Sequence, residues 1–200
     1  MKTVVMDASV LIDLASFGLL EQWFTLGLDT VTTSLVWREV NRKYQKARLQ
    51  RFAESGDVRI EPIGADVLTN IVLLQAEVSS KISFEDASVL HLASSRQAIL
   101  LVGDKVLRHC AEDHGIEVHG LLWVMDLLVS RGRLLPRVAA DRLEHLISRG
   151  TTRLPEREIV GNASTNGATS RIQLTNAGHT TGAACAPPPG VKGGITRKRG

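Results

Sequence analysis

The stretch TVVMDASVLIDLAS, residues 3–16, joins a short apolar strand to a helix, with Asp7 at the junction. The valine-rich run predicts a buried strand, and the apolar positions at helical spacing after it predict an amphipathic helix. The same order returns at ILLVGDKVLRHC, residues 99–110, with Asp104 at the junction. Strand–helix units of this kind favour a parallel sheet covered by helices.

The rest of the chain continues this alternation and predicts an α/β fold, a three-layer α/β/α sandwich with a central parallel sheet. Strands are expected at residues 3–6, 29–33, 57–63, 98–103 and 117–120. Helices are expected at residues 8–24 with a break near Gly18, and at 34–55, 65–80, 84–97, 104–115, 121–132 and 136–150.

Length and composition favour one folded domain with an appendage. Two hundred residues with 44% hydrophobic content can bury a substantial core. Residues 159–200 are poor in large apolar side chains, which predicts a disordered basic tail after a domain of residues 1–158. Five of the 24 basic residues and none of the 21 acidic ones lie in 161–200, so residues 1–160 carry a formal charge of −2. The predicted domain is therefore nearly neutral.

Cysteine usage and hydropathy predict a cytoplasmic protein without a membrane segment. Cys110 falls in a helical segment and Cys185 in the tail, and two such cysteines do not make a disulfide framework. Asp7 and Asp13 interrupt the apolar N-terminal stretch, which argues against a signal peptide. No run in the sequence approaches the roughly 18 apolar residues of a membrane span.

Four acidic residues are candidates for one site. In a parallel sheet the connections that follow the strands open at the carboxyl edge, where ligands bind. Asp7 and Asp104 follow strands directly, and Glu39 lies less than two turns into the helix after the second strand. Asp86 begins the helix before the 98–103 strand, so its place at this edge depends on a crossover that the sequence leaves open.

Each of these acids also has a structural explanation. Asp is a favoured helix cap, Ser83 and Asp86 have the spacing of a capping box, and Glu39 precedes Lys43 by one helical turn. If the four carboxylates lie close together, their negative charges must be neutralised, because two unit charges about 4 Å apart repel by roughly 4 kcal/mol at an effective dielectric near 20. Protons or a hard cation such as Mg²⁺ or Mn²⁺ can offset this repulsion, and such ions support phosphoryl chemistry.

The ordered segments VVMDASVLIDL, TTSLVWREV, ISFEDASVLHLA and ILLVGDKVLRHCAEDHG resemble a PIN domain, the nuclease fold of the VapC toxins of toxin–antitoxin systems. The resemblance spans residues 1 to about 158. It implies a ribonuclease that hydrolyses RNA phosphodiester bonds with Mg²⁺ or Mn²⁺, which Asp7, Glu39, Asp86 and Asp104 would bind. It implies that Ser9 is a hydroxyl neighbour of the ion. The partners it suggests are RNA, an antitoxin and a second copy in a homodimer.

Arg38, Arg42 and Lys46 recur along the segment that carries Glu39. A solvated basic face is the simplest explanation, but beside an acidic edge these residues are candidates for contacts with RNA phosphates.

Other functions remain as alternatives. Haloacid-dehalogenase-like phosphatases need a second Asp two residues after the first, where Ser9 stands. Receiver domains need paired acids before the first-strand Asp, where the chain has Val4, Val5 and Met6. Both are disfavoured. A catalytically silent PIN-like module that binds RNA or a protein partner stays open.

Overall fold

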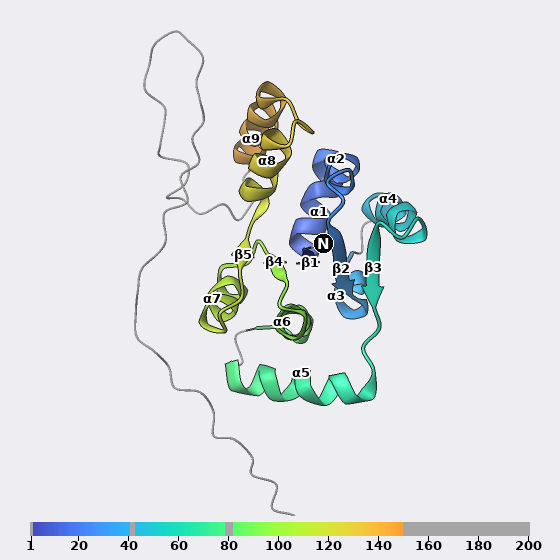
Figure 1. The fold of residues 1–200 in the computed structure, drawn as a ribbon, viewed down its shortest axis with the longest axis vertical. Coiled ribbons are helices and arrows are strands. Elements are labelled where there is room, and N and C mark those ends of the chain that lie inside the picture. The colour runs from blue at the N-terminus through green and yellow to red at the C-terminus, as the bar shows by residue number, and fades with distance from the viewer. Residues whose placement is uncertain (1, 41–42, 79–81, 150–200) are drawn as a thin grey trace, which may run out of the picture. The chain divides into compact units, whose positions relative to one another are not determined.

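The computed structural model describes residues 2–40, 43–78 and 82–149 (Figure 1). The strands of this part are β1 Thr3–Met6, β2 Asp29–Thr33, β3 Val58–Glu61, β4 Ile99–Leu101 and β5 Val118–His119. Its helices are α1 Ala8–Phe17, α2 Leu20–Phe24, α3 Ser34–Glu39, α4 Lys43–Glu54, α5 Ala65–Val78, α6 Phe84–Arg96, α7 Lys105–Asp113, α8 Leu121–Ser130 and α9 Pro136–Arg149. The chain divides into units of residues 1–163 and 164–200, and the second unit, like the whole of the predicted tail, lies outside the described residues.

The strands form one parallel sheet in the order β3-β2-β1-β4-β5. Val4 of β1 lies opposite Thr30 of β2 on one side and Ile99 of β4 on the other. The chain leaves β1 toward β2 and β3 and then crosses to β4, so strand order reverses at the β1–β4 pair. Ligands of parallel sheets bind at such a reversal, beyond the carboxyl ends of the strands. The predicted α/β/α sandwich is confirmed.

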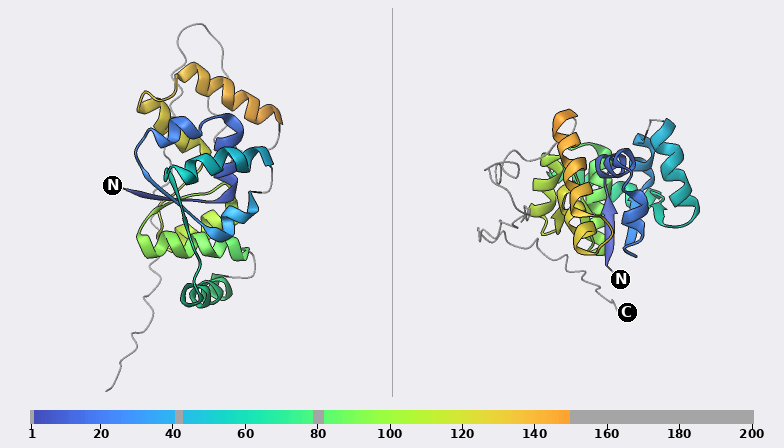
Figure 2. Two further views of the ribbon diagram at one scale, coloured as in Figure 1. Left: turned by 90° about the vertical axis from the view of Figure 1, so that its right-hand side faces the viewer. Right: turned by 90° about the horizontal axis from the view of Figure 1, so that it is seen from above.

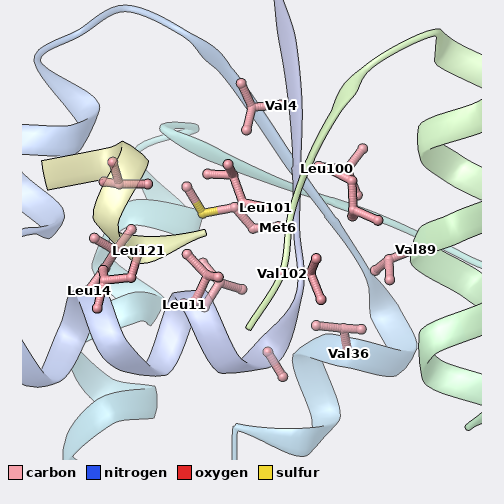
Figure 3. Close-up of a cluster of buried hydrophobic side chains, with 14 of the residues drawn as sticks. Val4, Met6, Leu11, Leu14, Val36, Val89, Leu100, Leu101, Val102 and Leu121 are labelled. Atoms are coloured by element: carbon pink, nitrogen blue, oxygen red, sulfur yellow. The ribbon is translucent and has the colours of Figure 1, made fainter. Parts of the chain in front are cut away.

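Helices cover both faces of this sheet, as the views in Figure 2 show. Met6 and Leu101 point from the strands toward Leu14 of α1, while Leu100 points the opposite way, toward Val89 of α6 (Figure 3). All five side chains are fully buried. Because β1 and β4 are buried on both faces, they read as nearly continuous apolar runs in the sequence.

Local signals in the sequence fix where the central helices begin and end. Asp7 caps the start of α1, and Gly18 ends it in the left-handed conformation, with φ 64°, which favours glycine. Ser83 and Asp86 form a complete capping box at the start of α6. These caps place two of the predicted acids at helix starts.

One predicted element is wrong. The segment 34–55 was expected to form one amphipathic helix, but α3 ends at Glu39 and α4 starts at Lys43. Val40 leaves the helical conformation, with φ −70° and ψ 75°, and its side chain is buried in the core. Burial of this apolar side chain outweighs the continuous helical pattern. Glu39 therefore ends a short helix and does not lie within a long one.

In the part of the chain that the structure describes, no helix is long and apolar enough to cross a membrane.

Candidate active site at the carboxyl edge of the sheet

Asp7 lies at the carboxyl end of β1, where it caps α1. Its Oδ2 accepts hydrogen bonds from the backbone N–H of Ser9 at 3.2 Å and from the Ser9 hydroxyl at 2.6 Å. Its own N–H donates to the carbonyl of Leu101 at 3.0 Å, so β1 stays joined to β4 up to this residue. Asp7 is only 6% exposed. A carboxylate buried to this degree depends on such donors, because loss of hydration costs free energy.

Ser9 connects Asp7 to the loop after β4. Its hydroxyl donates to Asp7 and accepts a hydrogen bond from the N–H of Gly103 at 3.1 Å. A Cβ at Gly103 would lie 3.0 Å from the Ser9 hydroxyl oxygen, so this close approach favours glycine. The predicted role of Ser9 beside an ion stays a prediction, but the structure places it against Asp7.

Glu39, the last residue of α3, is exposed. The helix that carries it is held against α6 by a buried pair of hydroxyls. Thr33 at the end of β2 caps α3, and its Oγ1 lies 2.8 Å from Oγ of Ser88. Ser88 also donates to the carbonyl of Glu85 at 2.6 Å. These hydrogen bonds bring α3 close to the first turn of α6, which carries Asp86.

Asp86 is partly buried and caps α6. Its Oδ2 accepts a hydrogen bond from the N–H of Ser83 at 2.9 Å, and its own N–H donates to the Ser83 hydroxyl at 3.0 Å. Asp86 also acts on residues outside α6. The negative charge of Asp86 contributes to raising the pKa of both Asp7 and Glu39.

These pKa shifts show which acids act on one another. Burial raises the pKa of Asp7, the hydrogen bonds from Ser9 lower it, and the charge of Asp86 raises it further. Loss of hydration is also the largest cause that raises the pKa of Glu39 to about 6, followed by the charges of Asp7, Glu85 and Asp86. The charges of these three acids therefore act on Glu39. Asp7, Glu39, Asp86 and Glu85 form the acidic cluster.

Glu85 was not predicted from the sequence. It stands next to Asp86 in the first turn of α6, where an acid is explained by the helix dipole. Only the approach of α3 to this turn gives Glu85 a second role, and no local pattern encodes that approach.

Asp104 differs from the other three predicted acids. It caps α7, and its Oδ1 accepts hydrogen bonds from the N–H groups of Val106 at 2.8 Å and Leu107 at 3.2 Å. Asp104 follows β4, the strand adjacent to β1, whereas Asp7, Glu39 and Asp86 act on one another through their charges.

The acidic cluster has the donor chemistry of a hard cation. Carboxylate oxygens suit Mg²⁺ or Mn²⁺, and a cation would offset the mutual repulsion seen in the raised pKa of Glu39. Among residues 2–40, 43–78 and 82–149, no group of three or more His, Cys, Asp or Glu is arranged so that it could hold a metal ion. Mg²⁺, however, commonly takes only one or two carboxylates and keeps water as its other ligands. The donor set fits that mode.

The predicted RNA-phosphate contacts are only partly visible. Arg38 is exposed and lies next to Glu39 at the end of α3. Lys46 belongs to α4, but its side chain, like the whole of Arg42, lies outside what the structure describes.

A hollow of about 240 Å³ lies away from the acidic cluster, between α5, α6 and α7. Asn70, Leu73, Glu77, His91, Ser94 and His114 are among its lining residues, and none of the four predicted acids is. Its lining includes two histidines and one acid, but none of its lining residues directly follows β1 or β4, where the strand order reverses. The acidic cluster is the better candidate site.

Comparison with known proteins bears on this choice. A PIN-domain family model, DUF3368, matches residues 3–161. The chain belongs to the PIN-domain family. PIN domains are generally nucleases, and they typically use divalent metals. No curated protein matches this PIN domain.

Among solved structures, this PIN domain is similar to the crystal structure of PAE2754 from Pyrobaculum aerophilum. The two are 16% identical, with a TM-score of 0.50, over 64% of this chain and 98% of the other. At that identity the likeness supports the fold alone, and the site must be argued from the residues of this chain.

Proposed function

We propose that this chain is a Mg²⁺- or Mn²⁺-dependent endoribonuclease. The observation that supports the proposal is the acidic cluster, in which Asp7, Glu39 and Asp86 come from different parts of the chain and the charge of Asp86 acts on both of the other two. Helix capping alone does not require acids this close to one another, and their charges add to the rise that burial causes in the pKa of Asp7 and Glu39. PIN domains are generally nucleases, which agrees with this chemistry.

In this proposal Asp7, Glu39 and Asp86 hold the ion, and Asp104 joins them from the end of β4. A bound divalent ion supplies a water of lowered pKa and stabilises charge on phosphate oxygens. Ser9 fixes the orientation of Asp7 through the 2.6 Å hydrogen bond.

Arg38, Arg42 and Lys46 are proposed to bind RNA phosphates beside the acidic cluster. Arg38 is exposed and adjacent to Glu39, which supports this assignment for one of the three. Such contacts raise affinity for any RNA sequence and weaken with salt.

The cellular role we propose is that of a toxin in a toxin–antitoxin pair, acting as a homodimer in the cytoplasm and inhibited by an antitoxin protein. PIN-domain nucleases often pair with antitoxins, which supports this role. Co-purification of the chain with the product of an adjacent gene, followed by loss of cleavage on adding that product, would test it.

The central test is cleavage of total cellular RNA by the purified chain, with and without Mn²⁺, followed by mapping of the new ends. We expect defined cleavage sites that appear only with the metal. RNA left intact under all metal conditions would contradict the endoribonuclease.

The second candidate function is a PIN-like module that binds RNA or a protein without cutting. The observation that favours it is the absence, among the described residues, of any three acids arranged to hold a metal. This module would bind RNA equally well with and without Mn²⁺ and leave it whole.

A further inference from the structure

Three consecutive hydrogen bonds connect Arg108 of α7 to Asp7. The Nη2 atom of Arg108 donates to the carbonyl of Val102 at 3.2 Å. The N–H of the same peptide unit, which belongs to Gly103, donates to the Ser9 hydroxyl at 3.1 Å. That hydroxyl donates to Oδ2 of Asp7 at 2.6 Å. We call this series the Arg108 relay.

The surroundings accommodate the relay closely. A Cβ at Gly120 would lie 2.9 Å from Nη2 of Arg108 and 3.5 Å from the carbonyl oxygen of Val102. A Cβ at Gly103 would lie 3.0 Å from the Ser9 hydroxyl oxygen. A side chain at either position would push against the relay, so two glycines leave the space that it occupies.

The charges at the two ends give the relay a direction. The first donor is a guanidinium and the last acceptor is a buried carboxylate, and hydrogen bonds in such a chain polarise one another. Other arginines of this domain bind carboxylates by contact, such as Arg48 with Glu21 at 3.1 Å. Arg108 instead donates to a carbonyl two hydrogen bonds away from Asp7. The 102–103 peptide and Ser9 therefore lie between Arg108 and the carboxylate.

We propose that Arg108 is a positioning residue for Asp7. Through the 102–103 peptide and Ser9 it holds Oδ2 in one orientation, which sets how the carboxylate is presented to a metal. Its effect on cleavage rests on the proposed function, whereas the relay itself can be tested without it. Arg108→Met removes the charge and the N–H donors but keeps a side chain of similar length. Arg108→Lys keeps a positive charge and N–H donors on a single nitrogen.

The first experiment follows the N–H of Gly103 by NMR in the metal-free protein. In Arg108→Met we expect its chemical shift to move and its hydrogen exchange to rise about tenfold, because a polarised hydrogen bond has been weakened. Arg108→Lys should restore part of both changes. Arg48→Met is the matched control, since Arg48 donates to the carbonyl of Ala15 at 3.2 Å near the far end of α1. A Gly103 signal unchanged in Arg108→Met would overturn the relay.

The second experiment measures Mn²⁺ affinity by calorimetry without RNA, and then kcat and KM. Loss of a residue that orients a metal ligand typically weakens metal binding 10- to 100-fold, and we expect about that loss in Arg108→Met. The same substitution in a Ser9→Ala background should add little, because the relay is already cut. Additive losses of Mn²⁺ affinity in the double variant would contradict positioning through Ser9. A raised KM with unchanged kcat and Mn²⁺ affinity would also contradict it and would indicate that Arg108 contacts an RNA phosphate directly. If the wild type neither binds Mn²⁺ nor cuts RNA, the proposed function fails, and the Gly103 signal alone decides the relay.

Discussion

Two junctions at the middle of the sheet look alike in sequence and differ in structure. Asp7 follows β1 and caps α1, and Asp104 follows the adjacent β4 and caps α7. Asp104 accepts two backbone N–H groups through one oxygen, which is ordinary helix capping. Asp7 accepts one N–H and one hydroxyl, is 6% exposed and has a pKa that burial and Asp86 raise.

This difference shows that the neighbouring residues, and not the position after a strand, distinguish a helix cap from a candidate metal ligand. At Asp104 the two hydrogen bonds from backbone N–H groups stabilise the start of α7. At Asp7 the fold also brings Asp86 and Glu39 near, and their mutual repulsion gives no stability. A feature that costs stability points to function more strongly than one that contributes to it.

The largest expected effect is that of Asp7→Asn. Loss of this carboxylate should lower kcat by at least about 10²–10³-fold, the scale seen when one group that stabilises a transition state is removed. RNA binding should remain measurable, because the metal acts mainly in the transition state. Cleavage of a labelled RNA in Mn²⁺, with binding measured in parallel, checks this. Equal cleavage by Asp7→Asn and the wild type would contradict the metal-nuclease mechanism.

The two roles of Asp104 can be separated with two substitutions. Asp104→Asn keeps an oxygen that accepts the N–H groups of Val106 and Leu107, so the melting temperature without metal should change little. Asp104→Ala removes the cap and should cost about 1 kcal/mol. If Asp104 also binds the ion, both variants should show a smaller rise of melting temperature with Mn²⁺ than the wild type.

The matched control is Ser83→Ala, which removes the hydroxyl that caps α6 but keeps the backbone N–H that donates to Oδ2 of Asp86. It should lower the melting temperature in the manner of Asp104→Ala and keep a Mn²⁺ response. A full Mn²⁺ response in Asp104→Asn would make Asp104 a cap only and leave the acidic cluster as the whole metal site.

Sequence patterns predicted the strands and most helices because these depend on local signals: valine-rich runs, caps at Asp7 and Ser83, and Gly18 after α1. They failed at Val40, where burial in the core ends α3 early. The acids after strands could be predicted from the topology of a parallel sheet. The approach of Asp86 and Glu85 to Glu39 could not, because it depends on the contact between Thr33 and Ser88, 55 residues apart.

Glu39 and Asp13 both have raised pKa values, but for different reasons. Comparing how stability depends on pH in variants of each separates the effect of neighbouring acids from the effect of burial. The pKa of Glu39 rises from 4.5 to about 6, in part through other acids, and that of Asp13 rises from 3.8 to about 6 through burial alone. The folded state holds both protons more tightly than the unfolded state. Each group therefore contributes stability below its unfolded pKa, and this stability is lost as pH rises to about 6.

Glu39→Gln and Asp13→Asn should each reduce the fall in the free energy of unfolding between pH 4 and 6.5, as measured by urea titration at several pH values. Only the Glu39 contribution should respond to Mn²⁺, because a cation offsets repulsion among acids and does not alter burial at Asp13. The difference with and without Mn²⁺ should thus persist in Asp13→Asn and shrink in Glu39→Gln. The same Mn²⁺ effect in both variants would mean that the acidic cluster is not the metal site.

The smallest effect concerns which junction RNA approaches. Arg38 is exposed beside Glu39, and Lys105 is exposed beside Asp104, so the two cations form a natural pair. Arg38→Ala should weaken RNA binding a few-fold for every sequence and reduce the slope of log affinity against log salt by about 0.7, the value for one phosphate contact on a single strand.

Lys105→Ala should change the slope less, because its junction lies outside the acidic cluster. Arg133→Ala, at an exposed arginine of another loop, controls for net charge. Fluorescence anisotropy at several salt concentrations measures all three, and a larger loss of slope in Lys105→Ala would place the RNA along β4 and not along α3.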